Sequence, residues 1–225
     1  MMLLLAALLL ANPEEPKWTA REVMDAHALA RIAILDPAEF YRSNRSDVVL
    51  QATNLGRDGY YFQYAISARY EECQDQEDGT CKHRISFRMA DFGARNVDNG
   101  FSGGLINELL AQEATKDRQA QRVAARSKSV RWMETDTLQC TGSFEALEAV
   151  RNSYHRPAPH FRLVDEGGDI FLHPSLYDVE MLGSYSSVSY RGPKYADGPA
   201  GKLEDLMDVL EACWQPSAAT PPWKR

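Results

Sequence analysis

The stretch between residues 155 and 178 contains the densest set of side chains with potential for acid–base or metal chemistry. Three histidines lie in it, at His155, His160 and His173. Carboxylates are interspersed with them at Asp165, Glu166, Asp169 and Asp178. An imidazole beside a carboxylate is the pairing used in general base catalysis and in metal binding. One hypothesis is therefore a small hydrolase or metal-dependent enzyme; the opposing interpretation is a proline-rich connection whose exposed polar residues have no catalytic part.

No nucleophile or cofactor motif accompanies these histidines. The chain lacks G-x-S-x-G, H-E-x-x-H, a phosphate-binding Walker loop and the dinucleotide glycine fingerprint. The tripeptide Asp91-Phe92-Gly93 matches the metal-binding tripeptide of protein kinases in letters only, because the other kinase motifs are missing. The sequence therefore predicts no cofactor and favours a protein without catalytic activity.

A basic segment between residues 116 and 131 is the second candidate site, for binding rather than catalysis. It contains a single acid, Asp117, among six cations: Lys116, Arg118, Arg122, Arg126, Lys128 and Arg131. Such a segment can contact an anionic surface, such as lipid headgroups or acidic glycans. The competing interpretation is a solvated linker between two halves of the chain.

Four cysteines indicate the compartment and part of the fold. An even number of cysteines suits an oxidising environment. We predict two disulfides, Cys73–Cys81 and Cys140–Cys213, because each bond then lies within one half of the chain. Metal binding by cysteine is disfavoured, since the chain has no C-x-x-C and only His83 stands near a cysteine. Oxidation of all four would leave no thiolate for catalysis.

Strands are expected where apolar and polar residues alternate. The alternation predicts strands over 60–72 and 81–91, joined as a hairpin, with a further strand near 47–53 completing an antiparallel meander. A helix that begins at Thr19 is expected to cover the apolar face of this meander.

The predicted hairpin contains a conflict of one residue. Residues directly opposite each other share a face, so pairing Cys73 with Cys81 would set Ile85, Phe87 and Met89 among polar residues. Burial of large apolar side chains is worth about 1.5–3 kcal/mol each and should prevail. We therefore expect a bulge near Glu71-Glu72 or Gly79, or else a diagonal disulfide.

The second half of the chain alternates strands and helices. We expect strands over 130–135, 176–182 and 185–191, a hairpin over 160–172, a helix from Ser143 and a final helix from about Pro199. The inner stripe of the first helix should contain Phe144, Leu147, Val150 and Tyr154. The fold class is therefore α+β, with antiparallel sheets and helices packed on one face. The expected organisation is an N-terminal half over 17–126, a C-terminal half over 127–214 and a mobile tail over 215–225.

Residues 1–11 form an apolar run typical of a secretory signal peptide. The run is too short to span a bilayer, which takes about 20 residues, and cleavage is expected after Ala11. The basic residue that usually precedes such a run is missing. No other segment is expected to cross a membrane, so the expected location is exported, either periplasmic or secreted.

Composition excludes one broad class of partner. The formal charge of −7 argues against a general nucleic-acid binder, which would normally be basic. Together these features favour an exported, disulfide-bonded, non-catalytic protein that acts through binding or is associated with the cell envelope. Its expected partner is a protein or an anionic envelope surface. The alternative is the enzyme that uses the histidines of residues 155–173.

Overall fold

The structure is a computed structural model of the 225-residue chain. It describes residues 19, 21–22, 36–41, 47–57, 63–75, 81–91, 130–154, 175–183 and 186–224, without the side chains of residues 57, 72–75 and 81–83. The predicted signal peptide, the hairpin over 160–172 and the three histidines lie outside these residues. Of the helix predicted from Thr19, only its first turn is described. There, the Thr19 and Glu22 side chains each bond the backbone N–H of the other, as a capping box does.

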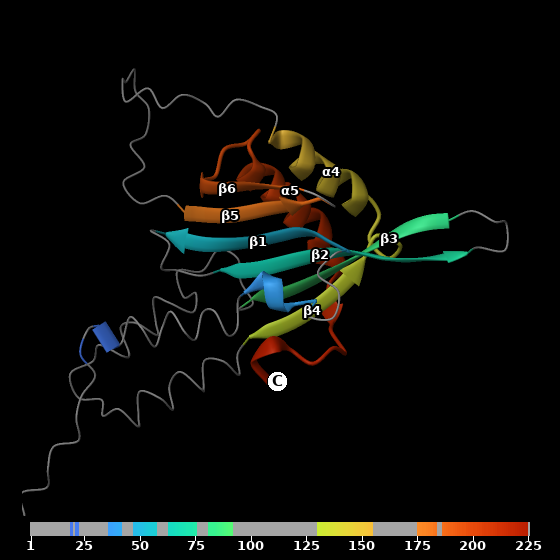
Figure 1. Ribbon diagram of the computed structural model, residues 1–225, viewed down its shortest axis with the longest axis horizontal. Coiled ribbons are helices and arrows are strands. Elements are labelled where there is room, and N and C mark those ends of the chain that lie inside the picture. Colours follow the sequence, from blue (N-terminus) through green and yellow to red (C-terminus); the bar gives the residue numbers. More distant parts are fainter. Residues whose placement is uncertain are drawn as a thin grey trace, which may run out of the picture.

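Within the described part of the chain, one seven-stranded antiparallel sheet dominates the fold (Figure 1). Its strands are β1 (Val48–Arg57), β2 (Tyr64–Asp75), β3 (Cys81–Asp91), β4 (Arg131–Asp136), β5 (Ser175–Leu182), β6 (Ser187–Pro193) and β7 (Gln215–Pro216). Their order is β6-β5-β1-β2-β3-β4-β7. The predicted meander is present as β1-β2-β3, and β5 pairs with β1 across 123 residues of sequence, as Asn54 opposite Tyr177 illustrates. Strands from both predicted halves therefore share one sheet.

Within the described ranges, two α-helices cover one face of this sheet, which we call the helix face. They are α4 (Ser143–Ser153) and α5 (Pro199–Leu210), and they pack with strands β1, β2, β3 and β5 in the main core (Figure 1). The predicted stripe of α5 is confirmed, since Leu203, Leu206, Met207 and Leu210 are all fully buried. The α+β class with helices on one face is also confirmed.

The inner stripe of α4 differs from the prediction at one position. Leu147 and Val150 are buried as expected, but Phe144 is 39 % exposed. The buried face of the helix begins instead at Ser143, whose hydroxyl donates to the Cys140 carbonyl at 2.7 Å. Because Ser143, Leu147 and Val150 follow helical spacing on one face, Phe144 falls at the edge of that face.

The conflict in the β2–β3 hairpin is resolved by a bulge. Tyr70 lies opposite Ile85, and Ile66 lies opposite Met89, so the apolar residues of both strands face the helices together. The register then shifts between Glu71 and Gln74, at one of the two predicted places. Burial of the apolar side chains therefore determines the register of β2 and β3. The one extra residue lies in β2, at the end of its apolar run. Cys81 has Asp75, not Cys73, as its ladder partner.

A second, smaller core lies on the opposite face of the sheet. The 3-10 helix η1 (Pro37–Glu39) is followed by Phe40 and Tyr41, which are buried there with Trp132 and Leu55. Asp36 caps η1 by accepting from the Ala38 N–H at 2.9 Å. η1 therefore positions Phe40 and Tyr41 on the face of the sheet opposite the helix face.

The C-terminal residues pack on the same small core. After α5 the chain forms η3 (Glu211–Cys213), β7 and η4 (Pro222–Lys224). The ring of Trp223 meets Trp132 edge-on at 5.6 Å between centroids, and the Trp132 indole donates to the Ala219 carbonyl at 2.9 Å. The C-terminal residues are therefore in contact with the small core; the predicted mobility of residues 215–225 stays a prediction.

Candidate functional site

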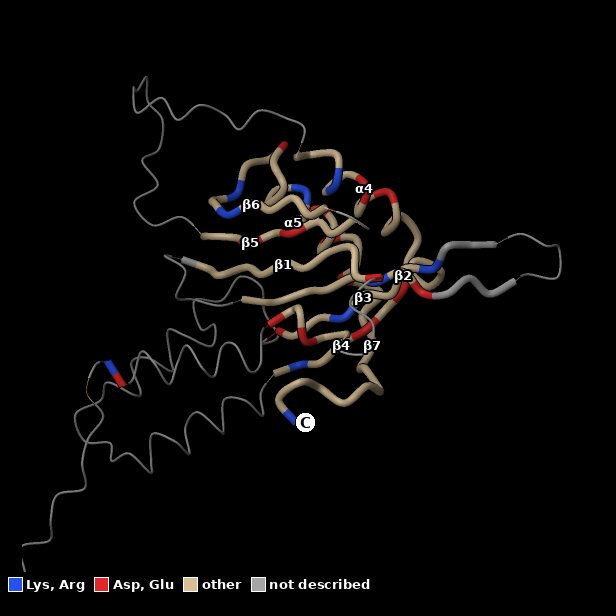
Figure 2. Tube along the Cα trace, in the orientation of Figure 1, with Lys and Arg blue, Asp and Glu red and all other residues tan. Residues whose placement is uncertain are grey.

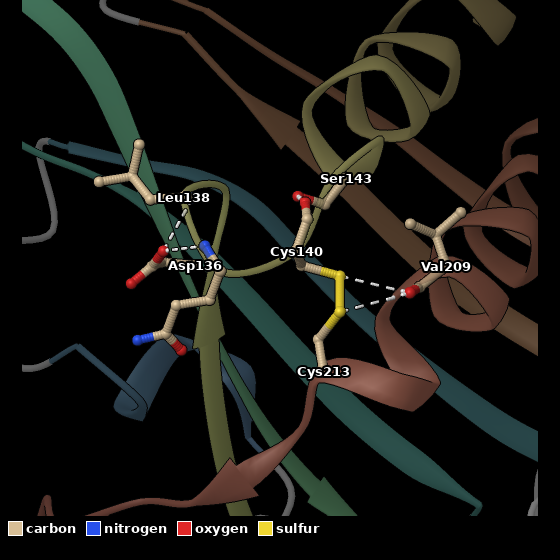
Figure 3. Close-up of a disulfide and its surroundings, with 7 residues drawn as sticks. Asp136, Leu138, Cys140, Ser143, Val209 and Cys213 are labelled. Carbon is tan, nitrogen blue, oxygen red and sulfur yellow. Dashed lines mark hydrogen bonds between the residues drawn. A yellow bond between two sulfur atoms is a disulfide. The ribbon is translucent and has the colours of Figure 1, made fainter.

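The predicted Cys140–Cys213 disulfide is present, and its surroundings are structural. It joins the turn after β4 to η3, with a Cα–Cα distance of 5.6 Å, and both sulfur atoms lie near the Val209 carbonyl oxygen (Figure 3). The turn itself is held by Asp136, whose carboxylate accepts from the backbone N–H groups of Leu138 and Gln139. The bond therefore fastens α5 to the sheet. The side chains of the second predicted pair, Cys73–Cys81, lie outside the described residues.

Of the six basic residues predicted to contact an anionic surface, the structure describes only Arg131. Its guanidinium makes two hydrogen bonds with the buried carboxylate of Asp91, at 2.7 and 2.6 Å. The hydrogen bonds that Arg131 donates to Asp91 raise the pKa of Arg131 further above its ordinary range. Its charge is therefore largely offset by Asp91. The other five basic residues and the three histidines lie outside the described part of the chain.

A densely bonded polar cluster lies beneath η1 on the opposite face. We call it the Tyr41 network; its members are Tyr41, Arg69, Glu71, Ser86 and Arg88. The Tyr41 ring has the guanidinium of Arg69 and that of Arg88 each 4.6 Å from its centroid, as in a double cation–π contact. Ser86 bonds both the Tyr41 hydroxyl and the Glu71 carboxylate.

Each member of the Tyr41 network is already bonded within it. Arg69 makes a bidentate pair with Glu71 at 2.8 and 2.9 Å, and Arg88 donates to the Phe40 carbonyl at 2.9 Å. Burial raises the pKa of Tyr41 far above its ordinary value, despite the two nearby cations. Burial also raises the pKa of Glu71, but hydrogen bonds from Ser86 and Arg69 outweigh it and lower that pKa overall. The arrangement holds η1 on the sheet and presents no accessible reactive group.

A second bonded cluster closes one end of the main core. The Tyr64 hydroxyl donates to the Glu204 carboxylate of α5 at 2.7 Å, and the Asn54 amide reaches the Tyr177 hydroxyl at 3.2 Å. The Asn54 oxygen also accepts from the Gly56 N–H at 2.8 Å, where the β1 register shifts and Gly56 adopts a φ of 62°. This cluster therefore orders the β1 bulge and the contact with α5.

An open groove of about 400 Å³ lies on the opposite face, beside η1. Its floor comes from β1, β5 and β6, and Pro37 of η1 forms one wall. The register sets its polar side chains in two rows, Thr53–Asp178–Arg191 and Gln51–Glu180–Ser189. Figure 2 shows acidic positions along β5, and the neighbouring strand β6 contains one basic residue, Arg191.

The polar side chains of the groove make fewer hydrogen bonds and ion pairs within the described residues than those of the Tyr41 network. Asp178 is 3.5 Å from Arg191, and both are substantially exposed. Glu180 makes no ion pair or hydrogen bond within the described part of the chain. Thr53 is only 6 % exposed, and its hydroxyl has no hydrogen-bond partner among the described residues. Most buried polar side chains in proteins are hydrogen-bonded, so an unpartnered one in the lining of a groove is informative.

Unpartnered polar atoms also occur away from the groove. The hydroxyls of Ser67 and Thr135 are buried without a hydrogen-bond partner. Neither residue belongs to the lining of the groove. Thr53 differs because its side chain lines an open cavity. Among the described side chains, the groove is therefore the best candidate for a ligand site.

Only part of the groove could be predicted from the sequence. The alternation in β5 predicts that Asp178 and Glu180 lie on the face away from the core, and this is confirmed. The partners that complete the groove come from β1 and β6, and nothing local in the sequence assigns them as neighbours. The signal available for β1 was its polar positions, such as Gln51 and Thr53, in a strand that begins with an apolar run.

The described residues were also compared with the features of membrane-spanning helices and metal sites, and the chain with known proteins. No described helix has the length and apolar character needed to cross a membrane. No group of three or more His, Cys, Asp or Glu side chains in the described ranges is placed to hold a metal ion. No protein-family model, curated protein or solved structure matches this chain.

Proposed function

We propose that this protein is an exported, disulfide-bonded binding protein without catalytic activity, and that the groove over β1, β5 and β6 is its ligand site. One observation carries the proposal. The groove combines two side chains that make no hydrogen bond or ion pair within the described part of the chain: Thr53, which is largely buried in the lining, and the carboxylate of Glu180. A ligand that bonds both groups would recover hydrogen bonds that the folded chain leaves unmade.

The surrounding fold favours binding without rearrangement. Gln51, Thr53, Asp178 and Glu180 lie on two hydrogen-bonded inner strands, so their spacing is fixed by the ladder. The Tyr41 network fixes η1, and with it the Pro37 wall. Groups held in place before binding lose little conformational entropy when the ligand arrives.

Export is supported by the cysteines and the apolar N-terminal run. A disulfide such as Cys140–Cys213 persists in oxidising compartments and is rare in reducing ones. Residues 1–11 fit a signal peptide. Cys73–Cys81 would be the second bond of the exported form, as a diagonal pair across the bulged end of the hairpin.

Ligand binding is tested by thermal unfolding of the purified protein against a panel of small polar compounds. We expect at least one compound to raise Tm in a concentration-dependent way, because a ligand that binds only the folded state stabilises it. The variants Thr53→Val and Glu180→Gln should lose this effect. Asp205→Asn, which changes a carboxylate on the exposed side of α5, should retain it. A panel with no stabilising member, or stabilisation that both groove variants keep, would refute the proposed site.

Export is tested by expressing the full chain in a bacterium and fractionating the cells. We expect a periplasmic or secreted product that begins at Asn12 and contains no free thiol under denaturing conditions. Peptide mapping should recover Cys140 joined to Cys213. A full-length cytoplasmic product with four free thiols would contradict this part of the proposal.

The absence of catalysis is tested by metal analysis. The competing hypothesis assigns His155, His160 and His173 to a metal centre, so the protein would then carry stoichiometric metal. We expect the purified protein to contain none, and a His→Ala triple variant to be indistinguishable in metal content. Stoichiometric zinc that the triple variant loses would favour the enzyme.

A further inference from the structure

We propose that the groove selects ligands that carry a protonated primary amine, with Glu180 as the residue that binds the ammonium group. This inference rests on the proposed function, since it names the ligand class of the same groove.

The charges of the lining leave one carboxylate uncompensated. Two carboxylates, Asp178 and Glu180, and one guanidinium, Arg191, line the groove. Arg191 lies opposite Asp178 in the ladder and 3.5 Å from it. Glu180 instead lies between Gln51 and Ser189, which are both uncharged. A cationic ligand would therefore find its opposite charge at Glu180, whereas an anionic ligand would be repelled there.

The hydrogen-bonding groups around Glu180 also match an ammonium. A primary ammonium has three N–H donors and no acceptor. Glu180, the Gln51 amide oxygen and the Thr53 hydroxyl offer acceptors on neighbouring positions of one face. The hydroxyl of Ser189 adds a fourth from β6. Acceptors therefore outnumber fixed donors on this side of the groove.

Thr53 lies opposite Asp178 and diagonally from Glu180, so a ligand bound at Glu180 would also reach its side chain. It is 6 % exposed, lines the cavity and has no described hydrogen-bond partner. Its branched side chain has few rotamers, so the direction of its hydroxyl is restricted before binding. The formal charge of −7 on the chain would add long-range attraction for a cation.

The test compares three sugars of matched shape by ligand-observed NMR with the exported protein. D-glucosamine carries the ammonium, N-acetyl-D-glucosamine has it capped as a neutral amide, and D-glucose lacks it. The fourth probe is a simple alkylamine, ethylamine. It distinguishes the contribution of the ammonium group to binding from that of the sugar ring. We expect glucosamine to bind at least tenfold more tightly than either neutral sugar, because hydrogen bonds to a charged group are the strong ones.

Two variants assign the effect to the groove. Glu180→Gln keeps the size of the side chain and removes its charge, so glucosamine binding should weaken about tenfold or more. Thr53→Val should weaken it less, because a neutral hydrogen bond is lost. Asp205→Asn is the matched control on the other face, and its affinity should equal that of the native protein.

The outcomes distinguish this inference from the proposed function. Equal binding of all three sugars, lost in Thr53→Val, would keep the groove as a ligand site and overturn its selectivity for amines. Failure of both glucosamine and ethylamine to bind would overturn the amine proposal, and the broader thermal panel would then decide the groove itself. Calcium ions that displace glucosamine and bind more tightly than it does would reassign Glu180 to a divalent cation, which also overturns the proposal.

Discussion

Two polar regions lie on the same face of the sheet, on the neighbouring strands β1 and β2 and beyond them, and they differ in how their polar groups are hydrogen-bonded. In the Tyr41 network, Arg69, Glu71 and Ser86 bond one another beneath a buried aromatic ring. In the groove, Thr53 and Glu180 have no such partners among the described residues. A satisfied polar cluster rigidifies a fold, whereas an unsatisfied one beside a cavity has bonding capacity left for a ligand. The two regions therefore differ in the state of their hydrogen bonds rather than in the types of residue.

Removal of the central ring should have the largest effect. Tyr41→Ala would delete a buried aromatic side chain and leave the Arg69 and Arg88 guanidiniums without their shared contact. We expect a loss of about 3–5 kcal/mol in the free energy of unfolding, typical of a buried aromatic residue replaced by alanine. Urea unfolding monitored by circular dichroism measures it. A loss below about 1 kcal/mol would contradict the comparison of the two regions, because the Tyr41 network would then contribute little to the stability of the fold.

Loss of the charge on Glu71 should have an intermediate effect that depends on pH. The pKa of Glu71 is lower in the folded protein than its ordinary value of 4.5. Its contribution to stability is therefore fully present above the unfolded pKa and is lost as the pH falls through the folded pKa. Glu71→Gln should cost about 1–2 kcal/mol at neutral pH and much less in acid.

The pH dependence is measured by unfolding titrations of both proteins from neutral to acidic pH. The difference between native and variant should shrink as the pH falls below that of an ordinary glutamate. A difference that stays constant over this range would show that the charge of Glu71 does not contribute.

Removal of one hydroxyl in each region should have the smallest effects on the free energy of unfolding. The two effects should nevertheless differ, with a loss in the Tyr41 network and little change or a small gain in the groove. Ser86→Ala removes a bonded hydroxyl of the Tyr41 network and should cost about 1 kcal/mol. Thr53→Val removes an unpartnered hydroxyl, so stability should change by less than about 0.5 kcal/mol or rise slightly. Equal losses at both positions would show that Thr53 has a structural role after all.

Much of the fold followed from local patterns, and the remainder depended on long-range pairing. Alternation placed Ile66 and Met89 on one face, and the mismatch with the cysteine spacing predicted the bulge after Glu71. The join between β1 and β5 was not predicted, because no local signal connects strands so distant in sequence. The described cover of the apolar face is provided by α4 and α5, whereas the sequence interpretation assigned it to the helix from Thr19.

The candidate site was less predictable than the fold for the same reason. Patterns in the sequence drew attention to His155, His160, His173 and the basic segment, which are dense in ionisable residues. The groove instead combines single polar residues from three strands, such as Thr53, Glu180 and Ser189. Each is unremarkable in its own strand, and only the register of β1, β5 and β6 brings them together.

The most direct test of the central claim is backbone amide chemical-shift mapping with the compound that stabilises the protein most. The account predicts shifts at Gln51, Thr53, Glu180 and Ser189, with the amides of Arg69 and Ser86 unchanged. Shifts concentrated around Arg69 and Ser86, with the groove unaffected, would contradict it.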